Sequence, residues 1–445
     1  MSHQRLDYNQ QIIAADTKFN KYRGAQGQGC GWISSTSSTP SQIRKTYLKR
    51  RIQLLSSESG ERNKTNPDAR KDINYLQIRT QLLRQNVRSM GMSDLHSTKS
   101  WSVSTATGES RQVAQGSAVS SSQYDFHGFH HLSDLHKAAV THLMFLHNSS
   151  STLVASSEDG SLSVHSLETE PPAVTATLSG HKAGVTDFDI STSNELLVSV
   201  SSDGSICVWQ LPGGGLLRQL SSPGCQTLTS CRFVPGNNTL VVVGSGAGLV
   251  QTVNTSTGIF PMSGTSRVPG SVLSIAMAGQ DNLLWAGTDR GTIISFRVET
   301  GGRLTKGHRT LVSDSGAAVT SVTSRPSPSV GHNMVLVNAV DNCLFLYKVT
   351  DALGCLSLYK KFSVVHSKLN IRSTFAPLMS YRSGDCVVSA SEDGAVYFFD
   401  VSRASKSCIN KLEAHSVPAL AVAFNYNESY LATSDQSGLV IVWKR

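Results

Sequence analysis

The sequence lacks any long hydrophobic run, and none of its apolar stretches approaches the roughly 18 residues of a membrane-spanning helix. Its first twenty residues contain Asp7, Asp16 and Lys18 and no hydrophobic block, so we expect no signal peptide. Eight cysteines occur, but no two form a CxxC pair. This cysteine usage indicates a reducing compartment. It predicts no metal site and no disulfide, and the lack of a long apolar run predicts no contact with a membrane.

Signatures of enzymes are lacking as well. The sequence contains no nucleophile elbow, no phosphate-binding loop, no HExxH motif and no paired carboxylates at a suggestive spacing. Its glycine-rich run at 244–248 joins two strand-like runs with no helix after it, which favours a tight turn over a nucleotide site. We therefore predict no catalytic residues, no cofactor and no small-molecule substrate.

What the sequence does contain is a repeat of short strands. Within 180–210, three β-rich runs are separated by turn residues, and Asp203-Gly204 is typical of a two-residue hairpin. The residue that closes the third run recurs every 43 to 52 positions, at His165, Trp209, Val253, Phe296, Tyr347, Phe399 and Trp443. Seven copies at this period are typical of a β-propeller, with one four-stranded blade per repeat.

We accordingly predict an all-β, seven-bladed propeller over 124–445. Two repeat intervals are longer than the others, and we expect an inserted loop at 325–329 and a longer turn at 351–354 to account for them. The last repeat ends without an outer strand of its own. A strand near 126–133 is expected to supply it, closing the ring and covering an otherwise unpaired edge.

The repeat at 180–210 resembles the WD40-repeat propeller family, because a His precedes the Asp-Gly pair by about twenty residues and an aromatic residue follows it. No copy contains a literal Trp-Asp pair. In that family a His, a Ser or Thr, an Asp and a Trp form one buried hydrogen-bond network. The resemblance implies such networks at His181, Ser199, Asp203 and Trp209, and at His415, Thr433 and Trp443. In the last repeat, Ser437 takes the position expected for the Asp.

Those residue types allow a second interpretation. Ser, His and Asp also form the triads of hydrolases, and propellers are known to carry enzymes as well as binding proteins. We favour the structural role, in which Asp accepts a hydrogen bond from His, His from Ser, and Ser from the indole N–H.

Residues 1–123 differ in composition from the predicted propeller. They hold 18 Lys and Arg against 8 Asp and Glu, a net charge of +10, whereas 124–445 hold 22 against 23. Segments 47–55 and 75–83 share a helix-forming pattern, and 89–123 are rich in Ser and Thr. We predict a basic, partly helical and partly disordered extension that contacts a nucleic acid, an acidic protein or an import receptor. A solvated basic tail is the alternative.

The densest basic cluster of the extension is a candidate nuclear-import patch. It consists of Arg44, Lys45, Lys49, Arg50 and Arg51.

Three further runs, at 283–291, 386–401 and 434–443, resemble a nuclear branch of the WD40-repeat family. This resemblance implies a non-enzymatic nuclear scaffold that binds other proteins in chromatin-linked transcriptional regulation, with the cytoplasm as a second location. Two alternatives stay open. One is a cytosolic or nuclear adaptor, such as a substrate receptor of a ubiquitin ligase. The other is a nucleic-acid-associated protein that uses 1–123.

A propeller presents loops on two faces, which suits the binding of several partners. In the WD40-like repeats a His, such as His181, comes just before the first strand of a blade. Residues that follow this His, or that flank the hairpin turns, are expected on one of these faces. On this ground the candidate partner-binding residues are Lys137, Lys182, Arg290 and Glu392.

Overall fold

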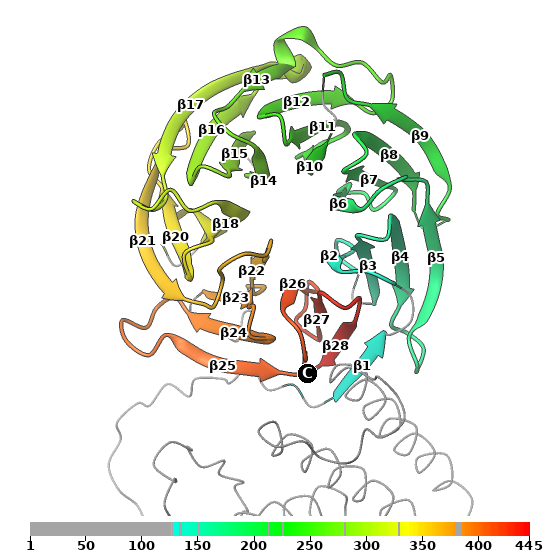
Figure 1. Cartoon of the computed structure of the whole chain (residues 1–445), viewed down its shortest axis with the longest axis vertical. Helices are drawn as coiled ribbons and strands as arrows, with labels where there is room; N and C mark the ends of the chain where they lie inside the picture. Colours follow the sequence, from blue (N-terminus) through cyan, green and yellow to red (C-terminus); the bar gives the residue numbers. More distant parts are fainter. Residues whose placement is uncertain are drawn as a thin grey trace, which may run out of the picture. The chain divides into compact units, whose positions relative to one another are not determined.

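The computed structural model describes residues 126, 128–132, 136–149, 151–211, 213–224, 227–279, 282–327, 330–378 and 385–445. These residues form seven four-stranded antiparallel sheets arranged around a central axis (Figure 1). The prediction of an all-β, seven-bladed propeller is confirmed. The expected helices at 47–55 and 75–83 and the candidate import patch lie outside the described residues.

In blades 1 to 4 the first strand lies nearest the axis and the fourth lies outermost. Blade 1 comprises β2 (Val140–Phe145), β3 (Thr152–Ser157), β4 (Ser161–Ser166) and β5 (Ala173–Ser179). Blade 2 comprises β6 (Val185–Ile190), β7 (Leu196–Ser201), β8 (Ser205–Gln210) and β9 (Leu216–Ser221). Blade 3 comprises β10 (Leu228–Val234), β11 (Asn237–Ser245), β12 (Leu249–Asn254), the 3-10 helix η1 (Met262–Gly264) and β13 (Thr265–Arg267). Blade 4 comprises β14 (Val272–Met277), β15 (Leu283–Thr288), β16 (Thr292–Val298), the 3-10 helix η2 (Thr300–Gly302) and β17 (Leu304–Leu311).

The remaining three blades complete the ring. Blade 5 comprises β18 (Val319–Ser327), β19 (His332–Ala339), β20 (Cys343–Val349) and β21 (Leu356–Ser363). Blade 6 comprises β22 (Ser373–Phe375), β23 (Cys386–Ala390), β24 (Ala395–Asp400) and β25 (Cys408–Glu413). Blade 7 comprises β26 (Ala419–Phe424), β27 (Tyr430–Asp435), β28 (Val440–Lys444) and, from the other end of the propeller sequence, β1 (Gly128–Leu132).

The ring is closed by β1, which pairs antiparallel with β28 from Gly128 opposite Lys444 to Leu132 opposite Val440. One blade therefore contains strands from both ends of the propeller sequence. The expected loop at 325–329 was wrong in part, because β18 continues through Ser327 and pairs with β19 along its length. This extension places Arg325 on an inner strand.

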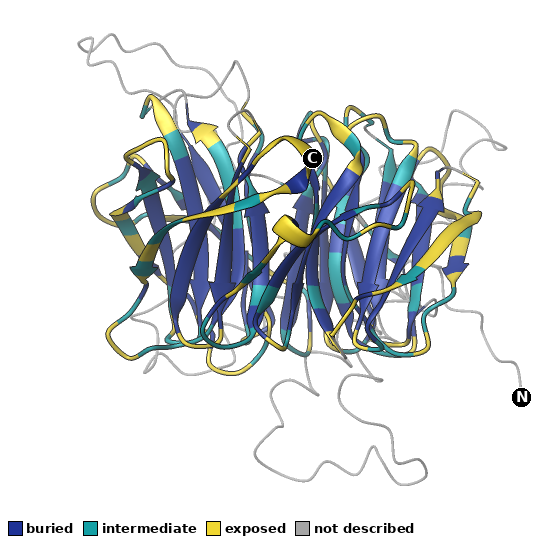
Figure 2. Cartoon of the chain, turned by 90° about the horizontal axis from the view of Figure 1, so that it is seen from above, coloured by how far each residue is buried: buried dark blue, intermediate teal, exposed yellow. Residues whose placement is uncertain are grey.

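The burial pattern follows from the packing of each sheet between two neighbours. β7, of sequence LLVSVS, is buried at five of its six positions, whereas five of the six residues of the outer strand β9 are exposed. A strand that is covered on both faces needs a continuous run of small and apolar side chains, which the middle strands supply. Figure 2 shows the buried strands between two layers of exposed loops.

The hydrophobic core lies between the blades. Among the described residues it divides into seven clusters, each formed by two adjacent blades. Trp209 and Phe188 of blade 2, for example, pack with Leu162 of blade 1. Burial of one such large side chain contributes about 1.5–3 kcal/mol, so each blade depends on its neighbours for stability.

Polar bonds around the axis add to this packing. In β2, β6 and β10 a register shift follows the first residue and leaves a threonine outside the regular pairing. Thr141 Oγ1 donates to the carbonyl of Val185 at 2.9 Å, and Thr186 Oγ1 donates to that of Leu228 at 2.9 Å. Thr229 Oγ1 repeats this bond to Val272 at 2.6 Å. Each bulge thus ties the inner strand of one blade to the next.

Among the described residues, which fold almost entirely into strands, no helix is long and apolar enough to cross a membrane.

Removal of residues 124–135 should expose the outer edge of β28 and weaken blade 7. We expect the 136–445 chain to melt at a lower temperature than the 124–445 chain and to associate as its concentration rises, because an unpaired strand edge is a template for pairing. Thermal unfolding and size-exclusion chromatography with light scattering measure both effects. An equally stable, monomeric 136–445 chain would show that β1 is dispensable.

Candidate functional site

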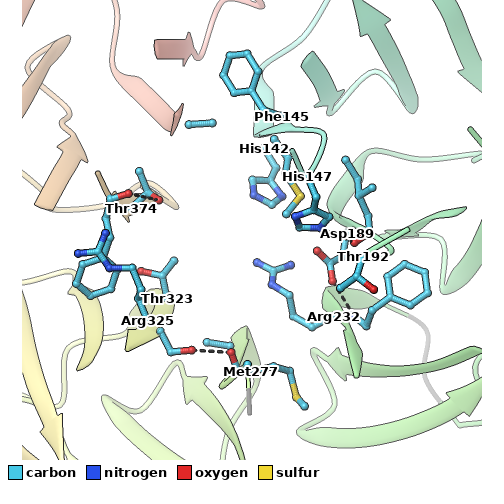
Figure 3. A pocket seen from close by; sticks show the side chains of 18 of the residues that line it. His142, Phe145, His147, Asp189, Thr192, Arg232, Met277, Thr323, Arg325 and Thr374 are labelled. Atoms are coloured by element: carbon cyan, nitrogen blue, oxygen red, sulfur yellow. Dashed lines mark hydrogen bonds between the residues drawn. The ribbon is translucent and has the colours of Figure 1, made fainter. Parts of the chain in front are cut away.

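A cavity of about 710 Å³ lies on the propeller axis. All seven blades contribute lining residues from or beside their inner strands, and blades 1, 2, 3, 4 and 7 also contribute the loop that leads from the inner strand to the second strand. Figure 3 shows His142, Asp189 and Arg232 on one side of the cavity and Arg325 and Thr374 on the other. The cavity therefore opens at the face formed by these loops, here called the cavity face.

The charged groups beside this cavity are organised by Asp187, a wholly buried residue of β6. Its Oδ2 accepts hydrogen bonds from Arg232 Nη1 at 2.8 Å and from the backbone N–H of Cys231 at 3.2 Å. Its Oδ1 lies 2.8 Å from His142 Nδ1 and 3.1 Å from Arg372 Nη2. Blades 1, 2, 3 and 6 each contribute to this ionic cluster.

Arg372 reaches across the axis to make its contact. It precedes the inner strand of blade 6, yet its Nε donates to the carbonyl of Thr141 and its Nη2 to the carbonyl of Thr186, each at 3.1 Å. These carbonyls belong to the bulges of blades 1 and 2. A guanidinium suits this position because its fixed N–H groups satisfy several acceptors at once.

The protonation states follow from burial and charge. Burial alone would raise the pKa of Asp187, but Arg232 and Arg372 hold it well below its usual range. Burial, assisted by the charge of Arg372, lowers the pKa of His142 to about 4, so His142 is neutral at pH 7. Complete burial raises the pKa of the neighbouring Asp189. The cluster thus combines one firmly ionised carboxylate with two guanidinium groups.

Two guanidinium groups approach the cavity from opposite sides (Figure 3). Arg232 is held by Asp187 and by the carbonyl of Cys231. Arg325 is held by Asp385 and by the carbonyl of Ala376. No sequence pattern pointed to Arg232, and Arg325 was placed in a loop, so sequence reasoning missed both residues.

The rim of the cavity carries polar and aromatic side chains. Tyr426 of blade 7 is 54% exposed. His147 of blade 1 is fixed by the carbonyl of Ile190 at 3.1 Å and by Asn194, whose Oδ1 accepts its backbone N–H at 2.9 Å. Arg and Tyr are the residue types that dominate the binding energy of protein interfaces.

The four residues expected to bind partners lie on the opposite face. Lys137, Lys182 and Arg290 are exposed there, at the connections that enter a blade or join its two middle strands. Glu392 has a different role: its carboxylate accepts hydrogen bonds from the backbone N–H groups of Ser367, Lys368 and Leu369. Although burial opposes the change, these bonds and that of the Ser367 hydroxyl lower the pKa of Glu392 to about 2. Its carboxylate is thus occupied within the chain.

In blade 2 the structure brings His181, Ser199 and Trp209 together. His181 Nε2 lies 2.7 Å from Ser199 Oγ, and Trp209 Nε1 donates to the same hydroxyl at 2.8 Å. The expected hydrogen bond from His181 to Asp203 is not formed, because the two side chains are 3.9 Å apart and Ser205 Oγ lies 2.8 Å from His181 Nδ1 instead. Ser199 is wholly buried and bonded to the indole, so it cannot reach a substrate.

Blade 7 contains the same network with its carboxylate in place. Thr433 Oγ1 lies 2.8 Å from His415 Nε2 and accepts from Trp443 Nε1 at 3.0 Å. The position that Ser437 was expected to fill is taken by Asp435, which lies 3.0 Å from His415 Nδ1 and accepts hydrogen bonds from Ser437. The assignment of Ser437 to this position was wrong, because the Asp lies two residues earlier in the turn.

Blade 1 forms a related network from other residues. His136 Nε2 lies 2.7 Å from Ser163 Oγ, which lies 2.8 Å from His165 Nε2. The hydroxyl comes from β4 rather than β3, and a histidine replaces the tryptophan. No single sequence pattern describes all three blades.

Comparison with known proteins identifies the repeats. The family "WD domain, G-beta repeat" matches residues 173–210 and 406–444, which contain the tryptophan networks of blades 2 and 7. Each match begins with the outer strand of one blade and continues through three strands of the next.

Several curated proteins are similar over part of the chain. The U3 small nucleolar RNA-associated protein 21 homolog of Schizosaccharomyces pombe is 32% identical over 98 residues, which are 22% of this chain and 10% of that protein. WD repeat-containing protein 90 of Mus musculus is 24% identical over 56% of this chain and 13% of its own length. WD repeat-containing protein SL1-17 of Schistosoma mansoni is 31% identical over 30% of this chain and 44% of its own length. The matches thus span less than half of each relative.

The fold and these matches together show a seven-bladed β-propeller that contains WD40 repeats at 173–210 and 406–444. This architecture is one that supports protein–protein interaction.

Replacement of Asp435 by Asn tests the network of blade 7. Burial alone would raise the pKa of Asp435, but several contacts lower it, and the hydrogen bond with His415 has the largest effect among them. The ionised carboxylate therefore stabilises the fold above the unfolded-state pKa of about 3.9, and this contribution is lost as the pH falls towards the lower folded-state value. We expect Asp435→Asn to lower the free energy of unfolding by about 1–3 kcal/mol at pH 7 and by less near pH 3.

Urea unfolding at several pH values measures this difference. The matched variant Asp203→Asn should cost less, because Asp203 lies 3.9 Å from its histidine. An Asp435→Asn deficit that does not change with pH would contradict the electrostatic role.

Proposed function

We propose that this chain is a non-enzymatic nuclear scaffold that binds other proteins through its cavity face. The observation that carries the proposal is the preformed axial cavity, in which Arg232 and Arg325 approach from opposite sides and Tyr426 stands exposed at the rim. Seven blades hold these groups on a rigid frame, which lowers the entropy cost of binding.

The chemistry of the cavity favours one kind of partner segment. Guanidinium groups bind carboxylates and carbonyls in fixed geometry, and they do so best where water is excluded. An acidic loop or chain end that enters the cavity would approach Arg232, which is paired with Asp187, and Arg325, which is paired with Asp385, while its flanking residues would pack on Tyr426. The partner is therefore proposed to offer an acidic segment beside an apolar or aromatic residue.

The same contacts support a non-enzymatic role. His142 forms a pair with Asp187, but in the described part of the chain no hydroxyl or thiol is hydrogen-bonded to His142. Burial raises the pKa of the nearby Cys231 thiol well above its usual value, so this sulfur stays protonated and unreactive at pH 7.

A nuclear location has two lines of support. The runs at 283–291, 386–401 and 434–443 resemble WD repeat-containing protein 13, and this resemblance implies a nuclear scaffold in chromatin-linked regulation. One relative is named as a U3 small nucleolar RNA-associated protein. We propose that Arg44, Lys45, Lys49, Arg50 and Arg51 provide the import signal.

A second candidate function is binding to nucleic acid through residues 1–123, whose net charge of +10 favours it. This interaction would weaken steeply as salt is added, because each phosphate contact releases a bound counterion. An adaptor role, such as that of a ubiquitin-ligase substrate receptor, would use the same cavity face.

Replacement of Tyr426 by Ala should remove a central anchor of the proposed interface. We expect the Kd for the most enriched nuclear partner, identified by capture on the full chain, to rise roughly 30-fold, the effect of a 2 kcal/mol hot spot. The matched control is Tyr359→Ala on the outer strand β21, where the tyrosine is 49% exposed, and it should bind like the wild type. Binding that survives Tyr426→Ala but is lost when Lys137, Lys182 and Arg290 are replaced by Ala would assign the interface to the opposite face.

Replacement of Lys49, Arg50 and Arg51 by Ala tests the import signal. A tagged chain with these changes should shift towards the cytoplasm, because import receptors recognise clustered Lys and Arg. Fluorescence microscopy measures the shift, and thermal unfolding should give an unchanged melting temperature for the propeller. Unchanged nuclear accumulation would reject this cluster as the signal.

A further inference from the structure

The turn between β20 and β21 of blade 5, residues 350–355, is docked onto blade 4. Three successive carbonyls of this turn accept hydrogen bonds from blade 4: that of Ala352 from Arg297 Nη2 at 2.7 Å, that of Leu353 from Ser295 Oγ at 2.7 Å, and that of Gly354 from Trp285 Nε1 at 3.0 Å. Trp285 is wholly buried, so the turn has a rigid support.

The backbone of blade 4 is shaped for this contact. A Cβ atom at Gly307 of β17 would lie 2.6 Å from the Leu353 carbonyl oxygen, so only glycine permits the approach. Ser295 Oγ also accepts the backbone N–H of His308 at 2.8 Å. One hydroxyl therefore fixes both the turn and the strand that carries His308.

This docking brings three metal-binding side chains together. The ligand atoms of His308, Asp351 and Cys355 all lie within 4.8 Å of one another. His308 Nε2 lies 2.8 Å from Asp351 Oδ2, and the two side chains are 42% and 40% exposed. Ligands of a tetrahedral zinc ion lie roughly 3.4 to 3.8 Å apart, as bond lengths of about 2.0 to 2.3 Å require.

The carboxylate is oriented as a metal ligand would be. Asp351 Oδ1 accepts the backbone N–H groups of Leu353 at 3.0 Å and Cys355 at 2.8 Å, which leaves Oδ2 directed towards His308. Partners of this kind fix the orientation of metal ligands.

We propose that His308, Asp351 and Cys355 bind one zinc ion between blades 4 and 5. One imidazole nitrogen, one carboxylate oxygen and one thiolate form a donor set that suits Zn²⁺, with water in the fourth position. On binding, the Cys355 thiol releases its proton to solvent as the zinc–sulfur bond forms, while neutral His308 binds through Nε2. The ion links the outer strand of one blade to the turn of the next.

The sequence carried no signal for this site. His308 precedes Asp351 by 43 positions, and the three residues follow none of the short spacings of zinc-binding motifs. The expectation of no metal rested on the missing CxxC pairs, whereas this site depends on contact between two blades.

The test uses the full chain after removal of metal with a chelator. Titration with Zn²⁺ against a chromogenic chelator should give one equivalent bound, and Co²⁺ should give a thiolate charge-transfer band in the near ultraviolet. Cys355→Ser should abolish the band, and Asp351→Asn and His308→Gln should each weaken Zn²⁺ binding by at least 10-fold. Asp351→Asn retains an oxygen for the two backbone donors, so it should preserve the turn.

The matched control is Cys408→Ser, which removes an exposed cysteine of blade 6. It should retain both the Zn²⁺ affinity and the charge-transfer band. Added Zn²⁺ should raise the melting temperature of the wild type and of Cys408→Ser but not that of Cys355→Ser. The absence of tight Zn²⁺ binding by the wild type, or equal binding by Cys355→Ser, would overturn the proposal.

Discussion

The buried carboxylate of Asp187 sets the arrangement of the axial cavity. It is wholly buried and lies within 3.1 Å of a guanidinium or imidazole nitrogen from each of three other blades. Such a group is stable only while its partners stay in place, and removal of one partner from a buried pair typically costs about 3–5 kcal/mol. The position of Arg232 in the cavity is therefore coupled to the ring as a whole, and Arg372 extends that coupling across the axis.

The blades achieve the same local bonding with different residues. Blades 2 and 7 join a histidine, a hydroxyl and a tryptophan, whereas blade 1 takes its hydroxyl from another strand and ends on His165. In blade 4 the buried Trp285 lies on the second strand and donates to the turn of blade 5. A buried polar group needs a partner, but several geometries supply one, so the repeat can diverge while each blade stays satisfied.

The sequence predicted those parts of the fold that depend on local pattern. The seven residues that close the third runs, from His165 to Trp443, all lie on the third strand of a blade, because strand length and hairpin turns recur at a fixed period. The pattern was misleading where local turn-forming residues suggested a loop but pairing with a neighbouring strand decided the structure. Pro326 and the surrounding serines suggested a loop, yet pairing with β19 extends β18 through them.

By itself, then, the sequence determined the number of blades, the segment that closes the ring and the excess of basic charge in 1–123. Only the tertiary structure decided which side chains of different blades meet, because His142, Asp187, Arg232 and Arg372 are far apart in the chain and are brought together by ring closure. The same holds for His308 with Asp351 and Cys355, which contact one another only because a turn of blade 5 docks on blade 4. Periodicity reports the strand of a blade on which each repeated residue lies, but contacts between blades are fixed by packing around the axis.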